Sequence, residues 1–177
     1  MSPASKAAMC GMCTALSVLL LFLGGVLTIF SYICPMITGI LMIALVSTFG
    51  FSSAWITYFA TSVLSFFLVP DKECMLMYVL FFGYYTIIRL FIEKIRFSAL
   101  RWGIKLIIFN AALFGVNVLL FYAFGIPFQS AGDGKAFLII FWIIMNIIFL
   151  LYEKLLGLLT VLYKKKIEKR LRKIMKK

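Results

Sequence analysis

Residues 6–25 read KAAMCGMCTALSVLLLFLGG, a stretch whose only charge is Lys6. About 20 consecutive apolar residues form a helix long enough to cross the hydrocarbon core of a bilayer. Over all 177 residues the composition is similar, because 64% are hydrophobic and 14% are charged. Soluble domains are about half apolar and about a quarter charged. We therefore expect an all-α membrane protein with no separate soluble domain.

Six apolar runs predict a bundle of six transmembrane helices. The second run has only 13 residues, so we expect that helix to be tilted or to span the bilayer incompletely. The first run is too long for the apolar region of a cleaved signal peptide, and we expect it to stay in the mature protein. The six runs cover residues 4–30, 36–48, 53–69, 75–92, 102–124 and 136–163.

Basic residues predict the orientation of the bundle. Lys94, Arg96 and Arg101 lie between the fourth and fifth runs, and residues 164–177 carry nine basic residues and one acid. The positive-inside rule places both segments, and so both termini, in the cytoplasm. We expect a transmembrane domain over 1–163 and a basic amphipathic tail over 164–177. That tail is either a topology anchor against anionic lipid or a surface for a partner.

Catalytic chemistry has little support in this sequence. The chain has no histidine and six acids, which form no paired motif for a divalent metal. Nucleotide fingerprints and nucleic-acid binding patterns are absent from the sequence. We expect no enzyme, no catalytic or metal-ligating residue, no cofactor and no nucleic-acid partner. Cys10 and Cys13 are expected to be buried thiols, and a disulfide between Cys34 and Cys74 stays open.

Polar residues inside apolar runs should face the bundle interior, because they are costly in hydrocarbon. Arg89, Lys105 and Glu153 form an inner group that we expect to neutralise charge between helices. An outer group, which consists of Tyr84, Tyr85, Asn117 and Asn146, is expected either to line a pocket for a small molecule or to hydrogen-bond between helices. With the loops above it, the candidate substrate-binding residues are Tyr32, Asp71, Lys72, Glu73, Tyr84, Tyr85, Asn117, Gln129, Asp133 and Asn146. The loop over 124–135 is either a lid or a simple turn.

Small residues recur at every fourth position of the first run, at Ala7, Gly11 and Ala15. Residues at this spacing share one helix face, and small side chains there let a second membrane helix approach closely. The stripe therefore predicts either docking to a partner protein or packing against a helix of the same chain.

Six helices with both ends inside, polar outer loops and the stripe on the first helix together resemble the S components of energy-coupling factor (ECF) vitamin transporters. The resemblance implies that Ala7, Gly11 and Ala15 dock onto a membrane T component, which works with two ATPase subunits. It also implies that the outer loops and the last three helices enclose a vitamin-like nutrient, in a bacterial plasma membrane. The chain is similar in form to MreD-like envelope proteins as well, so a scaffold without transport is the alternative.

Overall fold

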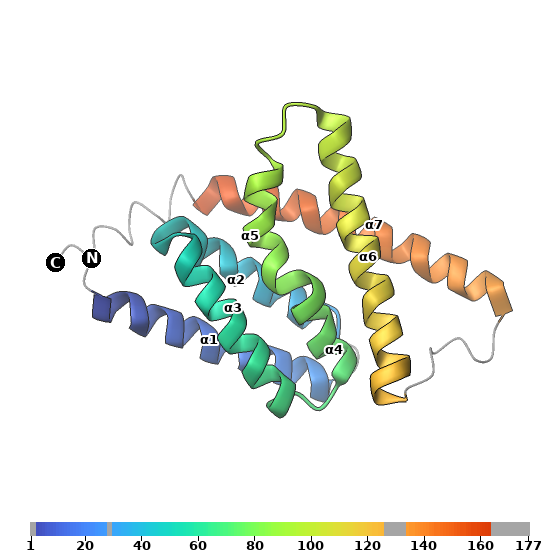
Figure 1. Cartoon of the computed structure of the whole chain (residues 1–177), viewed down its shortest axis with the longest axis horizontal. Coiled ribbons are helices and arrows are strands. Elements are labelled where there is room, and N and C mark those ends of the chain that lie inside the picture. The colour runs from blue at the N-terminus through green and yellow to red at the C-terminus, as the bar shows by residue number, and fades with distance from the viewer. Residues whose placement is uncertain (1–2, 28–29, 126–133, 164–177) are drawn as a thin grey trace.

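The computed structural model describes residues 3–27, 30–125 and 134–163, and all of its regular elements are helices (Figure 1). The expectation of an all-α bundle is confirmed. Three elements, α4, η2 and α5, follow one another without a break and form a single span over Lys72–Ile92. The elements are α1 (Pro3–Val26), α2 (Ile33–Phe49), α3 (Phe51–Leu68), α4 (Lys72–Met77), the π-helical turn η2 (Tyr78–Phe82), α5 (Gly83–Ile92), α6 (Ser98–Phe124) and α7 (Gly134–Leu162).

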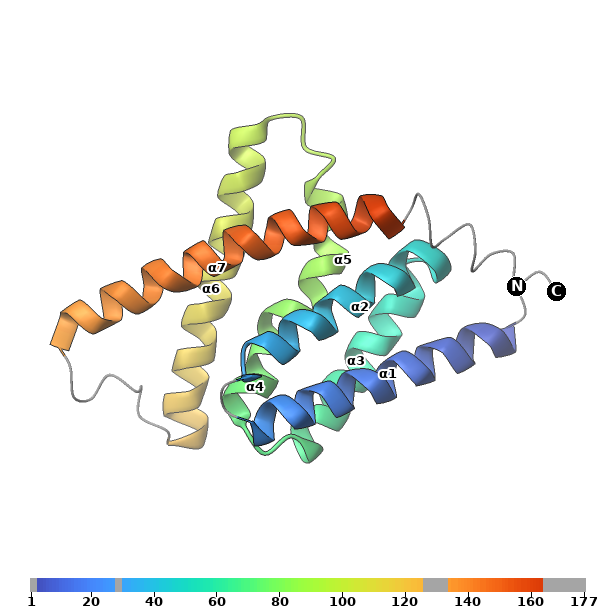
Figure 2. The same cartoon turned by 180° about the vertical axis from the view of Figure 1, so that it is seen from behind.

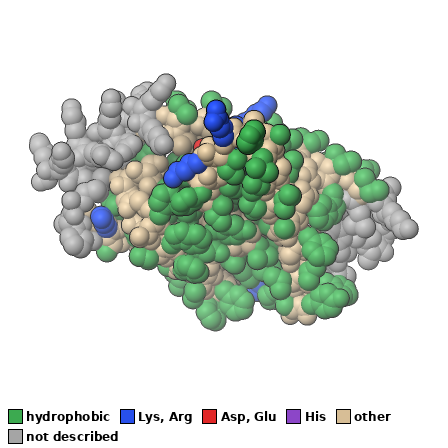
Figure 3. All heavy atoms as spheres, turned by 45° about the horizontal axis from the view of Figure 1, so that its top comes forward, with side chains coloured by type: hydrophobic (Ala, Val, Ile, Leu, Met, Phe, Trp, Pro, Cys, Tyr) green, Lys and Arg blue, Asp and Glu red, His purple; other side chains and the backbone are tan. Residues whose placement is uncertain are grey.

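Five of these spans are long and apolar enough to cross a membrane, and α2 is a shorter apolar helix. Large hydrophobic side chains are exposed along α1, α3, α6 and α7. Figure 3 shows one such largely hydrophobic face. A soluble protein would not leave so much apolar surface in water. The molecule is therefore a multi-pass membrane protein.

Helix α2 is longer than the apolar run predicted. It begins at Ile33 and not at residue 36, so Pro35 lies inside its first turn. Proline is tolerated there because the first backbone N–H groups of a helix have no intrahelical partner. Gly50 ends α2 and leads directly into α3 with φ 87°. This positive φ favours glycine and lets two helices meet without a loop.

The first three helices and the span α4–η2–α5 form the compact part of the bundle. Helix α1 packs against α2 and α3, while α2 also packs against η2 and α5. A Cβ added at Gly39 on α2 would lie 2.8 Å from the Phe82 carbonyl oxygen and 2.5 Å from the Tyr152 hydroxyl. Only glycine fits this crossing, which brings the backbones of α2 and η2 into contact.

Helices α6 and α7 join the compact part through aromatic side chains. Figures 1 and 2 show α7 crossing α6 on one side of the molecule. The rings of Phe109 and Phe149 stack at 4.6 Å between centroids, and Phe81 lies 4.5 Å from Tyr85 in the same cluster. All four rings are at most 3% exposed. Buried aromatic pairs contribute about 0.5–1.5 kcal/mol each beyond their burial, so this cluster fixes both outer helices.

Candidate functional site

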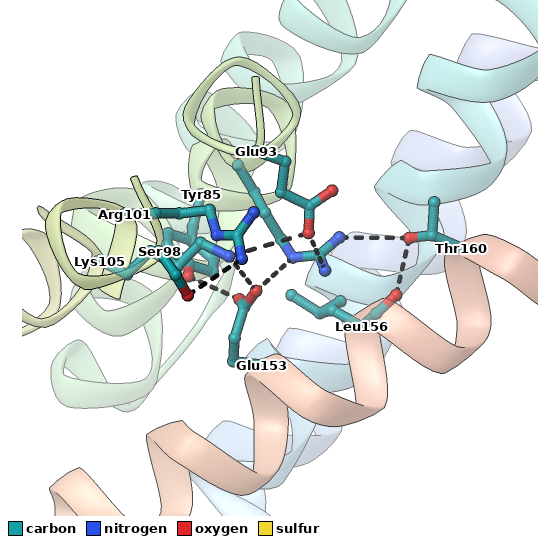
Figure 4. Close-up of polar contacts among 9 residues, drawn as sticks. Tyr85, Glu93, Ser98, Arg101, Lys105, Glu153, Leu156 and Thr160 are labelled. Atoms are coloured by element: carbon teal, nitrogen blue, oxygen red, sulfur yellow. Dashed lines mark hydrogen bonds and ion pairs between the residues drawn. The ribbon is translucent and has the colours of Figure 1, made fainter. Parts of the chain in front are cut away.

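The most polar buried site is a cluster of charges joining α5, α6 and α7. Glu153 on α7 accepts hydrogen bonds from Arg89 Nε at 2.8 Å, from Lys105 Nζ and from the Tyr85 hydroxyl at 2.7 Å. Glu93 forms an ion pair with Arg89 and lies 3.8 Å from Lys105 Nζ. Figure 4 shows these groups converging on Glu153. Two cations thus face two carboxylates, which balances the cluster.

Helical spacing explains why these side chains meet. Tyr85, Arg89 and Glu93 lie four residues apart, so they share the face of the helix that points toward Glu153. Arg89, Lys105 and Glu153 are each at most 4% exposed. Charges this deeply buried need partners with good geometry, because their desolvation costs several kcal/mol each. The cluster therefore exists only if α5, α6 and α7 are held together.

The prediction that Arg89, Lys105 and Glu153 neutralise one another is confirmed. The assignment of Tyr85 to the outer group is wrong, because its hydroxyl bonds Glu153 in the inner cluster. The sequence reading also missed Glu93, although its place one turn after Arg89 is the signal that could have found it.

A second polar site links two loops at the opposite end of the bundle. The Ser31 hydroxyl donates to Asp71 Oδ2 at 2.8 Å, and the Tyr32 hydroxyl donates to Glu73. Asp71 also caps α4 by accepting from the Glu73 N–H at 2.9 Å. Burial, together with the nearby Glu73 carboxylate, raises the pKa of Tyr32 well above its usual value. Tyr32 therefore stays a neutral donor at this end.

Four of the predicted substrate-binding residues meet at this end, since Lys72 follows Asp71 at the start of α4. Its ammonium donates to the carbonyl oxygens of Phe66 and Val69, both at 3.2 Å. These contacts join α3 to α4. The site is thus made of residues that bond one another, and none of them lines the three cavities described below.

The predicted asparagines lie elsewhere. Asn146 and Asn110 exchange reciprocal side-chain hydrogen bonds of 2.9 and 3.2 Å between α6 and α7. Asn117 donates to the Leu113 carbonyl oxygen of its own helix at 2.7 Å. Buried amides commonly join membrane helices in this way. Asn146 also faces an open groove of about 490 Å³ along α7, which is otherwise apolar.

The remaining candidates do not complete one pocket. Tyr84 packs edge-on against Tyr58 with centroids 6.1 Å apart. Gln129 and Asp133 lie outside the described residues, as does most of the loop that was a candidate lid. The basic tail over 164–177 lies outside them too. The structure therefore brings together Tyr32, Asp71 and Glu73, but not these three with Tyr84, Tyr85, Asn117 and Asn146.

An apolar cleft of about 620 Å³ opens at the same end as Asp71. Its walls come from the last turns of α3 and α6, and its floor comes from α4 and η2. A cavity of this size matches those that hold small molecules in proteins. The lining residues are Ser62, Val63, Phe66, Phe67, Met75, Leu76, Val79, Leu119, Ala123 and Phe124. The sequence reading missed it, because a lining of apolar residues carries no distinguishing motif.

The small-residue stripe on α1 faces away from the bundle. Ala7, Gly11 and Ala15 are all exposed, and a Cβ added at Gly11 would have no atom within 4 Å. By contrast, a Cβ at Gly24 on the same helix would lie 2.7 Å from Cys34 Cβ. Of the two alternatives for the stripe, packing against a helix of the same chain has no supporting contact among the described residues.

Cys34 and Cys74 are both free buried thiols beside Gly24. The Cys74 thiol contacts the Leu21 carbonyl oxygen at 3.6 Å. Cys10 and Cys13 are free and half-buried. All four thiols thus serve as small apolar side chains in the packing of the described helices.

Compared with protein-family models, curated proteins and solved structures, the chain has no match.

Proposed function

We propose that this protein is the substrate-binding membrane subunit of an uptake system, docking through α1 to a second membrane protein. The observation that carries the proposal is the exposed face of Ala7, Gly11 and Ala15, which no helix of the described chain covers. Between membrane helices, close backbone approach is the main route to tight packing. A face of small residues left open by its own chain suits a helix of another protein.

The apolar cleft supplies the substrate site in this proposal. It lies at the end where Asp71 links two loops, which the positive-inside rule assigns to the outside of the cell. The docking stripe lies in the other half of α1, because that helix begins at Pro3 near the inner end. One surface can therefore hold a substrate while the other holds a partner.

The chemistry of the cleft lining also limits the kind of substrate. Ser62 is its one polar side chain. Apolar walls with few convergent polar groups favour an uncharged, largely hydrophobic molecule. We propose that energy comes from a separate T component and ATPases, as the resemblance to ECF S components implies.

Purification from native membranes tests the docking surface. We expect the wild-type chain to co-purify with a membrane partner and ATPase activity, and Gly11→Leu or Ala15→Leu to lose both. Leucine at these positions holds helix backbones apart. Ala111→Leu is the matched control, because Ala111 is exposed on α6, far from the stripe in sequence.

A filled cleft tests the substrate site separately. Ala123→Phe places a ring in the cleft and should remove any small molecule that co-purifies with the wild type, as measured by mass spectrometry. Partner association should persist in this variant. If no small molecule accompanies the wild type and proteins of envelope synthesis co-purify, the scaffold alternative replaces transport.

A further inference from the structure

A cleft of about 240 Å³ opens beside the buried charge cluster, at the other end of the molecule from the apolar cleft. It is formed where the end of α5, the start of α6 and α7 meet. Basic side chains gather at the top of the Figure 3 view, where the connection between α5 and α6 comes forward. The lining residues are Arg89, Glu93, Arg101, Trp102, Lys105, Glu153 and Lys154.

The lining carries more positive than negative charge. Arg89 and Lys105 are neutralised by Glu93 and Glu153. Arg101 and Lys154 also line the cleft, and neither forms an ion pair with a carboxylate among the described residues. Arg101 has only a 3.5 Å contact to the Ser98 hydroxyl. Two cations therefore face this cleft without a counter-charge.

The surroundings strengthen attraction for an anion. Arg101 lies in the first turn of α6, a helix of 27 residues whose amino-terminal end carries partial positive charge. Glu153 and Lys105 are buried at the base of the cleft. The cleft is therefore bounded by protein, whose effective dielectric constant is lower than that of water, and charges interact more strongly there. An anion bound here would gain from Arg101, Lys154 and the helix end together.

We propose that this cleft binds a phosphate group on the cytoplasmic side of the membrane. An arginine fork pairs with two phosphate oxygens at once, and lysine adds a point charge. The volume equals that of about eight water molecules at about 30 Å³ each, which admits one phosphate with a small attached group. The phosphate belongs either to the headgroup of an anionic phospholipid or to a soluble phosphate compound.

The position of the cleft suits both sources. It lies beside the connection between α5 and α6, which the positive-inside rule places at the cytoplasmic surface. Basic pockets between membrane helices at that level meet lipid headgroups and cytoplasmic solutes alike. The site is separate from the proposed docking stripe and from the apolar cleft, so it does not depend on the proposed transport function.

Binding to the purified full chain tests the proposal. The probes are phosphatidylglycerol, phosphatidylcholine and inorganic phosphate, followed by native mass spectrometry for the lipids and calorimetry for phosphate. We expect Arg101→Gln/Lys154→Gln to weaken binding of the anionic probe about 25-fold, at about fivefold for each basic residue near a membrane surface. The control Lys94→Gln/Arg96→Gln removes the same charge from neighbouring exposed positions outside the lining.

The outcomes separate the two sources. Preferential retention of phosphatidylglycerol that inorganic phosphate does not displace identifies a lipid headgroup site. Binding of inorganic phosphate that competes with the lipid identifies a site open to soluble phosphates. The proposal is overturned if neither phosphatidylglycerol nor inorganic phosphate binds the wild type, or if Lys94→Gln/Arg96→Gln weakens binding as much as Arg101→Gln/Lys154→Gln. If Arg101→Gln/Lys154→Gln unfolds, the single variant Lys154→Gln replaces it in the test, because Lys154 is exposed.

Discussion

Glu153→Gln should strongly destabilise the folded protein. Glu153 is 4% exposed and accepts hydrogen bonds from Arg89, Lys105 and Tyr85. The substitution keeps the size of the side chain but removes its charge, so Lys105 is left with only the partly exposed Glu93 at 3.8 Å. Removing one partner of a buried ion pair costs about 3–5 kcal/mol. Glu93 still pairs with Arg89, so we expect the lower end, about 3 kcal/mol.

Thermal unfolding in a mild detergent measures this loss. For a chain of this size about 1 kcal/mol shifts the melting temperature by about 2–4 °C, so Glu153→Gln should lower it by about 6–12 °C. Arg96→Gln is the control, because Arg96 is exposed and its loss should change stability by less than about 0.5 kcal/mol.

A double variant separates charge imbalance from lost packing. Lys105→Met/Glu153→Met removes both charges and leaves Arg89 paired with Glu93. Apolar replacement of a whole buried pair is often neutral, so the double variant should recover most of the lost stability. Equal melting temperatures for Glu153→Gln and Arg96→Gln would refute the argument that buried charge balance holds α5, α6 and α7 together.

Three further changes test other contacts. Gly39→Ala should lower the melting temperature, because its Cβ would meet the backbone of η2, whereas Gly103→Ala, with open space around it, should not. Asn110→Leu and Asn146→Leu should each cost about 0.6 kcal/mol, and a double-mutant cycle should show them coupled, since their amides bond each other. A cysteine introduced at position 98 in a chain without its native cysteines should react with membrane-impermeant reagents only from the cytoplasmic side; labelling from outside would reverse the orientation.

Periodicity and charge predicted most of the fold. Apolar runs located the five long apolar helices and the shorter helix α2, because a segment that crosses a bilayer must be long and almost free of charge. The same physics found the inner charge group, since Arg89, Lys105 and Glu153 are too costly in hydrocarbon to lie apart. Both predictions depend on the high free-energy cost of placing a charged group in hydrocarbon, which can be judged from the residue types alone.

The candidate site was less predictable. Depth along a helix assigned Tyr85 to the outer group, although its direction around the helix brings it to Glu153. The sequence did not show whether the Asn146 side chain would bond Asn110 or a ligand, because either partner satisfies the hydrogen bonds of its amide. The apolar cleft depends on which faces of α3 and α6 have no other helix packed against them. Where all faces of a helix are apolar, the pattern of residue types does not indicate which face this is.

The π-helical turn η2 explains why the directions of side chains around the span Lys72–Ile92 could not be predicted from the spacing of residues in the sequence. A π turn holds roughly one more residue than an α turn, and one residue rotates the following faces by about 100°. Before η2, Met75 and Leu76 form the floor of the apolar cleft; after it, Tyr85 and Arg89 point to Glu153. In an unbroken α-helix, Tyr85 and Arg89 would be rotated by this angle about the helix axis relative to Met75 and Leu76. One irregular turn thus lets a single span serve the cleft at one end and the charge cluster at the other.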